Sequence, residues 1–240
     1  MLQPHPFAVP FVDYQKERAT MSSASEEKKE QSKKYVLLNT TFELLKEMPP
    51  NELTARKIAA KSDCTPTVIY KHFNSLDHLI MVASVRFLEQ YIEEVQSILT
   101  SSDDEFAGLR TMWLCFASKA FCNPEIFLMM FWGIDSDQLS DAIFEYYELF
   151  PQALHGLDGL FTSVFFNNDL HERDFIVVRR AAVAGAFNVK DARMISDMEC
   201  AMFRGYISEF CSLPSEQRDA QAATDYFMTM LDVLYSKFRK

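Results

Sequence analysis

Hydroxyl, phenol and cationic side chains are concentrated in one short stretch of the sequence, residues 53–73. A threonine can contact a thymine methyl group or exchange a hydrogen bond with a base, and a lysine can reach guanine O6 and N7 or a phosphate. This chemistry predicts a surface that reads double-stranded DNA. The side chains available to face outward are those of Arg56, Lys57, Lys61, Thr67, Tyr70 and Lys71.

Two short helices joined by a tight turn would position these side chains. Thr54 precedes ARKIAAKS and Thr65 precedes PTVIY, and a threonine hydroxyl can accept an orphan amide proton at a helix start. Pro66 suits the first helical position, where a missing N–H costs nothing. The apolar residues Ile58, Ala59, Cys64, Val68 and Ile69 can close into one small core. The pattern predicts a helix-turn-helix.

The rest of the chain favours an all-α fold. It has 240 residues with only 6 Gly but many Leu, Ala, Met, Glu and Lys. Apolar spacing and turn residues predict helices over residues 32–47, 76–99, 104–121, 124–132, 136–149, 152–166, 171–187, 191–210 and 215–238. We therefore expect a helix-turn-helix domain over residues 32–78 and a helical regulatory and dimerisation domain over residues 79–240.

Residues 1–31 are expected to form a poorly ordered tail, because a proline-rich start and a polar run cannot bury enough apolar surface. Met21 opens the polar run, and a start of translation there is a hypothesis that mass spectrometry of the native protein can test. The cluster of Lys28, Lys29, Lys33 and Lys34 fits either an arm on the phosphate backbone or a solvated charge run.

The net charge of −10 is unevenly distributed. Residues 1–80 contain 11 Lys and Arg against 10 Asp and Glu, whereas residues 81–240 contain 13 against 24. A nearly neutral N-terminal part with clustered cations, joined to an acidic remainder, suits a DNA-binding head on a regulatory body.

The segment 34–80 resembles the DNA-binding head of the TetR family of bacterial transcriptional regulators. That head has a first helix with an aromatic-containing turn, a threonine and Ile-Ala in the second helix, and a recognition helix ending Tyr-x-His-Phe. The matching residues here are Phe42, Thr54, Ile58-Ala59 and Tyr70-Lys71-His72-Phe73, followed by Ser75-Leu76-Asp77-His78-Leu79 at the connecting helix.

The resemblance implies roles for individual residues. Thr54, Tyr70 and His72 would anchor the head on the DNA backbone or orient the recognition helix. Residues at or near base edges would be Thr65, Pro66, Thr67 and Lys71. The candidate DNA-binding residues are therefore Thr54, Arg56, Thr65, Pro66, Thr67, Tyr70, Lys71 and His72. Capping and packing roles are the alternative for several of them, and for His72 packing is as reasonable as a phosphate contact.

Two positions depart from the family pattern. Asp63 stands where the family has a glycine in the turn, and Asp tolerates the left-handed backbone conformation better than most residues. Leu76 stands where the family has a lysine that contacts phosphate. Loss of one such contact lowers the salt dependence of binding by about one unit.

For the body, the resemblance implies a homodimer through residues about 191–238 and an enclosed site for a small-molecule effector. The dimer stripes would contain Ile195, Met198, Ala201, Met202, Gly205, Tyr226, Met230, Val233 and Leu234. The effector pocket would be lined by Trp113, Phe116, Phe127, Met130, Phe131, Phe144, Tyr147 and Phe165. The same residues also fit an ordinary internal core. As a group, they favour an apolar or amphipathic ligand.

Other classes of site find little support in the sequence. No Gly-rich phosphate loop, GxSxG or HExxH motif occurs, so no catalytic residue, metal ligand or cofactor is predicted. The five cysteines lack CxxC spacing, which favours reduced thiols in the cytoplasm. No apolar run is long enough to span a bilayer.

The expected function is that of a ligand-responsive transcriptional regulator, specifically a repressor that a small molecule releases from a palindromic operator. One alternative is a protein of the same architecture that acts through a protein partner without specific DNA binding. A third reading is an all-α enzyme or lipid carrier that uses the aromatic interior.

Overall fold

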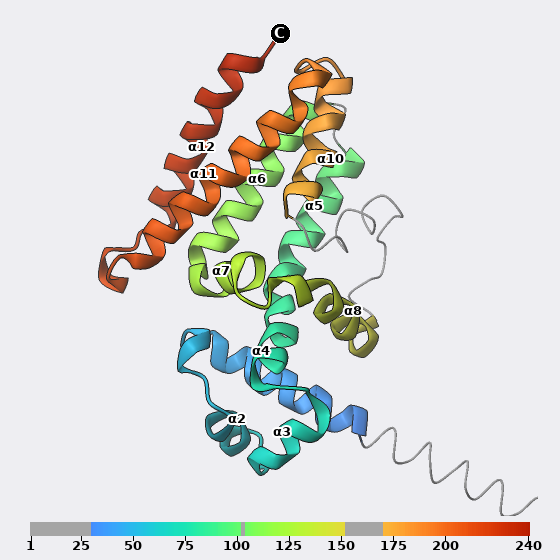
Figure 1. Ribbon diagram of the computed structural model, residues 1–240, viewed down its shortest axis with the longest axis vertical. Helices are drawn as coiled ribbons and strands as arrows, with labels where there is room; N and C mark the ends of the chain where they lie inside the picture. Colours follow the sequence, from blue (N-terminus) through green and yellow to red (C-terminus); the bar gives the residue numbers. More distant parts are fainter. Residues whose placement is uncertain (1–29, 102–103, 152–169) are drawn as a thin grey trace, which may run out of the picture.

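The computed structural model describes residues 30–101, 104–151 and 170–240, and all regular structure in these ranges is helical, as predicted (Figure 1). A first helix covers residues 30–45. The further α-helices are α2 (Ala55–Lys61), α3 (Pro66–His72), α4 (Leu76–Ser84), α5 (Glu89–Ser101), α6 (Glu105–Cys122), α7 (Pro124–Trp132), α8 (Leu139–Leu149), α10 (Leu170–Val183), α11 (Ala192–Ser212) and α12 (Ala220–Phe238). Short 3-10 helices lie at η1 (Pro50–Glu52), η2 (Val85–Leu88), η3 (Ser136–Gln138), η5 (Val189–Asp191) and η6 (Ser215–Gln217).

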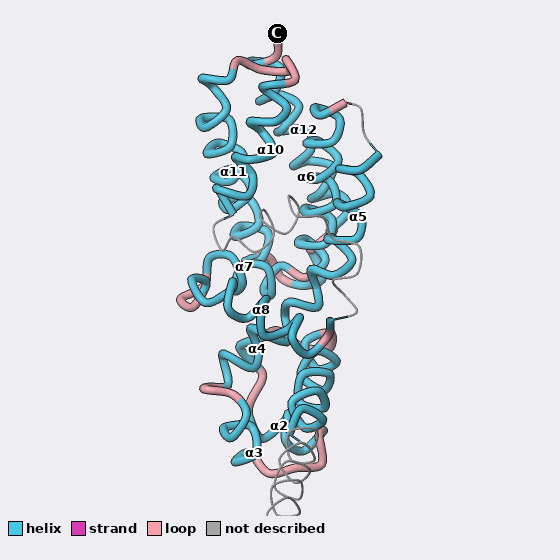
Figure 2. The backbone as a smooth tube through the Cα atoms, turned by 90° about the vertical axis from the view of Figure 1, so that its right-hand side faces the viewer, coloured by secondary structure: helices cyan, strands magenta, loops and turns pink. Residues whose placement is uncertain are grey.

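The molecule is elongated, with a small group of helices at one end. We call residues 30–73 the head, and the described residues from Glu89 onward the body. Helix α4 leads from the head toward the body, and α7 and α8 lie between the head and the long helices (Figure 2). Most of the predicted tail and the predicted helix over 152–166 lie outside the described residues.

The head is held together by a compact apolar core. Ile58 and Ile69 are fully buried, and Leu37, Leu38 and Phe73 are nearly so. Burial of these side chains from the first helix, α2 and α3 fixes the angle between the two short helices. The prediction of a small core within residues 53–73 is confirmed for Ile58, Ala59 and Ile69.

The prediction of one long helix over 76–99 is wrong, because η2 interrupts it between α4 and α5. At the end of α4, the Ser84 hydroxyl donates to the Ile80 carbonyl at 2.7 Å, a contact that often bends helices. Within η2, Arg86 donates to Asn39 of the first helix at 2.7 Å and lies 4.4 Å from the Phe42 ring centroid. These contacts of Arg86 hold η2 against the first helix of the head.

The helix predicted over 171–187 ends earlier, at Val183. Gly185 has φ of 102°, which favours glycine, and its N–H donates to the Ala182 carbonyl. The Ala186 N–H donates to the Ala181 carbonyl. This pair of bonds is a Schellman motif, which terminates the helix at the glycine.

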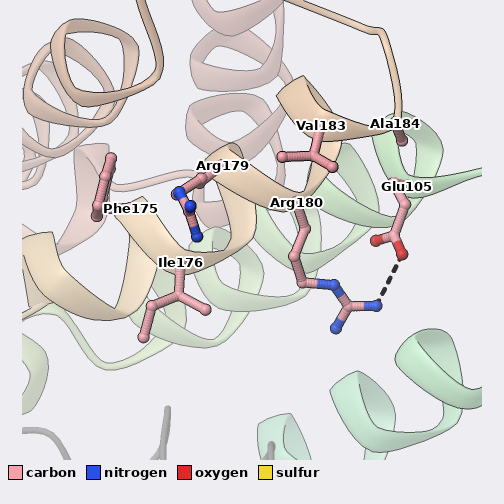
Figure 3. Close-up of a pocket in the computed structure, with 7 residues that line it drawn as sticks. All are labelled: Glu105, Phe175, Ile176, Arg179, Arg180, Val183 and Ala184. Atoms are coloured by element: carbon pink, nitrogen blue, oxygen red, sulfur yellow. Dashed lines mark hydrogen bonds and ion pairs between the residues drawn. The ribbon is translucent and has the colours of Figure 1, made fainter. Parts of the chain in front are cut away.

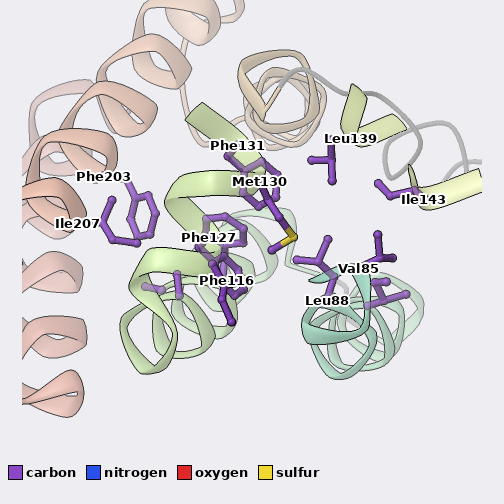
Figure 4. Packing of buried hydrophobic residues seen from close by; sticks show 14 of the residues in the cluster. Val85, Leu88, Phe116, Phe127, Met130, Phe131, Leu139, Ile143, Phe203 and Ile207 are labelled. Atoms are coloured by element: carbon purple, nitrogen blue, oxygen red, sulfur yellow. The ribbon is translucent and has the colours of Figure 1, made fainter. Parts of the chain in front are cut away.

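Aromatic side chains dominate the core of the body. Phe127, Met130 and Phe131 of α7 lie between Phe203 of α11 and the η2 segment (Figure 4). The Phe116 ring lies 5.2 to 5.5 Å from the rings of Phe127, Phe131 and Phe203. These separations are typical of packed aromatic pairs.

Among the described residues, no single helix is long and apolar enough to cross a membrane. The pair α6 and α7 passes that test jointly by length and composition alone, with a bend of 113° between the two helices.

Candidate nucleic-acid interface

Helices α2 and α3 place the predicted DNA-binding side chains on the outer surface of the head. Thr54, Arg56, Thr65, Thr67 and Lys71 are exposed. Tyr70 is 56% exposed although its neighbour Ile69 is fully buried. Pro66 and His72 are partly buried. Helix α3 therefore pins one face into the core and presents a phenol, hydroxyls and a cation on the other.

The cations of the head fall into two groups. Lys57 donates to the Glu52 carbonyl at 2.9 Å, and Lys61 pairs with Glu47 at 2.9 Å. Arg56 and Lys71 make no hydrogen bond or ion pair to the residues that the structure describes. Because no described carboxylate neutralises their charges, these two are the cations of α2 and α3 best placed to meet phosphate.

The two threonine caps differ in their hydrogen bonds. The Thr54 hydroxyl accepts from the Lys57 N–H at 3.2 Å, as predicted. Thr65 has the extended backbone of an N-cap, but its side chain makes no capping hydrogen bond. The prediction that the Thr65 hydroxyl caps α3 is therefore wrong, and that hydroxyl is available to a ligand.

His72 sits among several charges at the end of α3. Partial burial lowers its pKa, Glu30 raises it, and Lys33, Lys34 and Lys71 lower it. Since the net effect is a pKa below the ordinary value, the imidazole is mostly neutral at pH 7. A neutral imidazole suits a hydrogen bond better than an ion pair with phosphate.

The turn before α3 has the backbone expected for the Asp-for-Gly departure. Asp63 has φ of 50°, and the Cys64 N–H donates to the Ala59 carbonyl at 3.0 Å. Leu76, the second departure, is partly buried against the apolar core at the start of α4. The Ser75 hydroxyl caps α4 by accepting from the His78 N–H at 2.9 Å.

The predicted effector residues do not all share one environment. Trp113, Phe116, Phe127 and Phe131 are buried in the aromatic core of the body, and Met130 and Tyr147 are also buried. Phe144 is 54% exposed, so the structure places it at the surface rather than in that core. Phe165 lies outside the described residues.

A pair of buried carboxyl groups was missed by the sequence analysis. The Trp113 indole N–H donates to Glu199 at 2.8 Å, and Asp174 is also buried. Burial raises the pKa of Asp174 to about 6, and burial together with repulsion from Asp174 raises that of Glu199 well above its usual range. A signal was present, because Glu199 lies four residues after Ile195 and four before Phe203 on a buried helical stripe.

The outer side of α10 forms a groove of about 590 Å³ with the start of α6 (Figure 3). Arg180 donates to Glu105 at 2.8 Å, whereas Arg179 is exposed. The lining residues are Glu105, Phe175, Ile176, Arg179, Arg180, Val183 and Ala184. Its size is in the range of small-molecule sites.

No family model matches the amino-acid sequence, and no curated protein matches it significantly. Solved structures share the fold. A TetR transcription regulator from Haloarcula marismortui is 16% identical with a TM-score of 0.56, covering 87% of this chain and 99% of that chain.

Two further structures are similar. RolR in complex with resorcinol is 13% identical with a TM-score of 0.53, covering 88% of this chain and 94% of its own. The fatty acid degradation regulator FadR from Bacillus halodurans is 13% identical with a TM-score of 0.52, covering 83% and 94%. At these identities the likeness concerns the fold, which is the helix-turn-helix head and helical body of TetR-type regulators.

Proposed function

We propose that this protein is a cytoplasmic, dimeric, ligand-responsive transcriptional regulator that binds operator DNA through α3. The observation that carries the proposal is the outer face of α3. There Tyr70 and Lys71 on the helix and Thr65 at its N-cap are exposed, while Ile69 is buried in the core. A helix that presents exposed hydroxyl, phenol and cationic groups fits the major groove.

The proposed dimer forms through the outer face of α11 and α12. Met198, Tyr226 and Val233 are 41%, 58% and 59% exposed there, which is unusual for large apolar side chains. An added Cβ at Gly205 meets open space, so a second helix can approach closely. Ile195 and Leu234, which the sequence analysis assigned to the same stripe, are instead buried within the chain.

Repression released by a small molecule is the proposed mode of regulation. RolR is described with bound resorcinol, and FadR as a regulator of fatty acid degradation. The aromatic interior of this chain supports an apolar or amphipathic effector. Binding would favour a body conformation in which the two heads no longer match half-sites one DNA turn apart.

A gel-shift titration against the DNA upstream of the protein's own gene, at several salt concentrations, tests the proposal. We expect Tyr70→Ala to weaken binding to all sequences and Thr67→Ala to change the preference among sites. Absence of sequence-specific binding by the unaltered protein at low salt would contradict it.

The dimer can be tested separately with Gly205→Trp. Since the position is open in the single chain, the variant should fold with an unchanged circular dichroism spectrum. Sedimentation should show a monomer, and operator affinity should fall because one head reads only half a site. If the Gly205→Trp variant still forms the dimer, the dimer interface does not include this position.

A second candidate function is regulation through a protein partner without specific DNA binding. It is favoured by Leu76, which removes an expected phosphate contact, and by the exposed carboxylates of Asp63 in the head and Asp77 at the start of α4. The same gel-shift titration separates the two functions.

A further inference from the structure

A single carboxylate of the body contacts two elements outside it. Glu145 of α8 accepts a hydrogen bond from Lys34 of the first helix at 3.1 Å. Its other carboxylate oxygen lies 3.0 Å from Nε2 of His78 on α4. The Glu145 and His78 side chains are only 22% and 17% exposed. Partly buried pairs are screened less by salt than pairs on the open surface.

The second ring nitrogen of His78 continues this contact toward the recognition helix. The Asn74 N–H donates to His78 Nδ1 at 3.3 Å, and Asn74 follows directly after the C-cap of α3, Phe73. Because Nδ1 accepts this N–H, the proton of the neutral imidazole is on Nε2, which faces the Glu145 carboxylate. The Phe73 and His78 rings also meet at 5.8 Å.

Helix α8 is well placed to move this contact. The Tyr146 hydroxyl donates to Glu89 of α5 at 2.5 Å, and the Phe150 ring lies 4.9 Å from the Tyr35 ring of the first helix. Tyr146 and Phe150 stack on each other at 4.6 Å. A shift of α8 by about one ångström would move the Glu145 carboxylate and His78 Nε2 beyond hydrogen-bonding distance of each other.

We propose that Glu145, His78 and the Asn74 amide form a hydrogen-bond relay that sets the position of α3 relative to the body. Glu145 and His78 are thus positioning residues for DNA recognition. This inference rests on the proposed function, because a defined position of α3 matters only if α3 reads DNA. Through this relay, a movement of α8 in the body would change the position of the C-terminal end of α3.

Two substitutions of His78 break the relay at different ends. His78→Asn keeps an acceptor near the position of Nδ1 and loses the reach to Glu145. His78→Gln keeps a donor near the position of Nε2 and loses the bond from Asn74. Glu145→Gln removes the charge at nearly constant shape. The matched control is Glu148→Gln, an exposed position on the same helix.

The first readout is the ratio of operator affinity to random-DNA affinity by gel shift. We expect each of the three relay variants to lower it about threefold to tenfold, as for loss of one hydrogen bond. Combining Glu145→Gln with His78→Asn should cause no further loss, since both act on one relay. Glu148→Gln should leave the ratio unchanged. Additive losses, or an unchanged ratio in the variants, would overturn the relay.

The second readout needs no DNA. Hydrogen exchange of the Asn74 amide should be faster in Glu145→Gln than in the unaltered protein or in Glu148→Gln, at matched melting temperature. Unchanged exchange would overturn the relay by itself. If the unaltered protein binds no operator but the exchange difference appears, the proposed function fails while the relay stands.

Discussion

The head has its characteristic polar side chains at the surface, whereas the body has two acidic side chains in its interior. In the head, Arg56, Tyr70 and Lys71 lie on the surface over a small apolar core. In the body, Asp174 and Glu199 lie beneath an aromatic layer and have raised pKa values. The head thus leaves cations exposed at its surface, whereas the body buries two acidic groups whose raised pKa values favour the protonated, neutral form.

The largest expected effect comes from the body core. Phe116→Ala should lower the free energy of unfolding by about 3 to 5 kcal/mol, because it removes a buried ring that packs on three others. Tyr70→Ala, at an exposed position of the head, should change stability by less than about 0.5 kcal/mol while weakening DNA binding. Urea unfolding of both variants checks this contrast, which fails if Tyr70→Ala proves as destabilising as Phe116→Ala.

The next effect concerns the buried acids. A carboxyl whose pKa is raised in the folded state binds more protons there than in the unfolded chain, so stability falls as pH rises from about 4 to about 6 through the pKa of Asp174. Glu199→Gln keeps an acceptor for the Trp113 N–H and removes the repulsion. We expect it to stabilise the protein by about 1 to 3 kcal/mol at pH 8 and to remove the part of the pH dependence that Glu199 contributes.

Thermal unfolding between pH 4 and pH 8 measures the effect. Glu209→Gln, at an exposed position of the same helix, is the control and should follow the unaltered protein. A Glu199→Gln variant less stable than the unaltered protein at pH 8 would mean that the two acids attract through a shared proton more strongly than they repel.

A smaller effect is expected from the cations of the head. Arg56→Gln and Lys71→Gln should each weaken DNA binding and reduce the slope of log affinity against log salt by about one unit. Lys61→Gln should reduce it less, since Lys61 is already paired with Glu47. Equal losses at all three positions in salt-dependent gel shifts would show that pairing within the protein does not select the phosphate contacts.

The smallest expected effect is an increase in DNA affinity. Leu76→Lys restores a cation at the start of α4 and should raise the salt slope by about one unit with a modest increase in affinity. Leu76→Met, which keeps an apolar side chain of similar size, is the control. A decrease in operator affinity for Leu76→Lys would indicate that the apolar contact of this residue matters more than charge.

Sequence reasoning succeeded where the relevant contacts are local. The Thr54 cap, the buried Ile58 and Ile69 and the left-handed Asp63 follow from residues within one or two turns of each other. The all-α class is likewise a sum of local preferences. The DNA contacts themselves remain predictions.

One local prediction, the Thr65 cap, is wrong. The interruption at η2 and the Glu145–His78 contact were missed because they depend on parts of the chain that are distant in sequence. An apolar stripe over 76–99 is compatible with one helix, whereas the packing of Arg86 against Phe42 and Asn39 accompanies the interruption at η2. The Glu145–His78 contact joins residues far apart in sequence, and neither stands out in its own helix. Such pairings become visible only when the elements are placed in space.

The four residues of η2 also set the length and phase of the link between head and body. A 3-10 helix rises about 2.0 Å and turns about 120° per residue, against about 1.5 Å and 100° for an α-helix. Conversion of Val85–Leu88 to α geometry would draw the head about 2 Å toward the body and rotate it by about 80° about the link. A change of hydrogen-bond pattern in this segment would therefore both translate and rotate the head relative to the body.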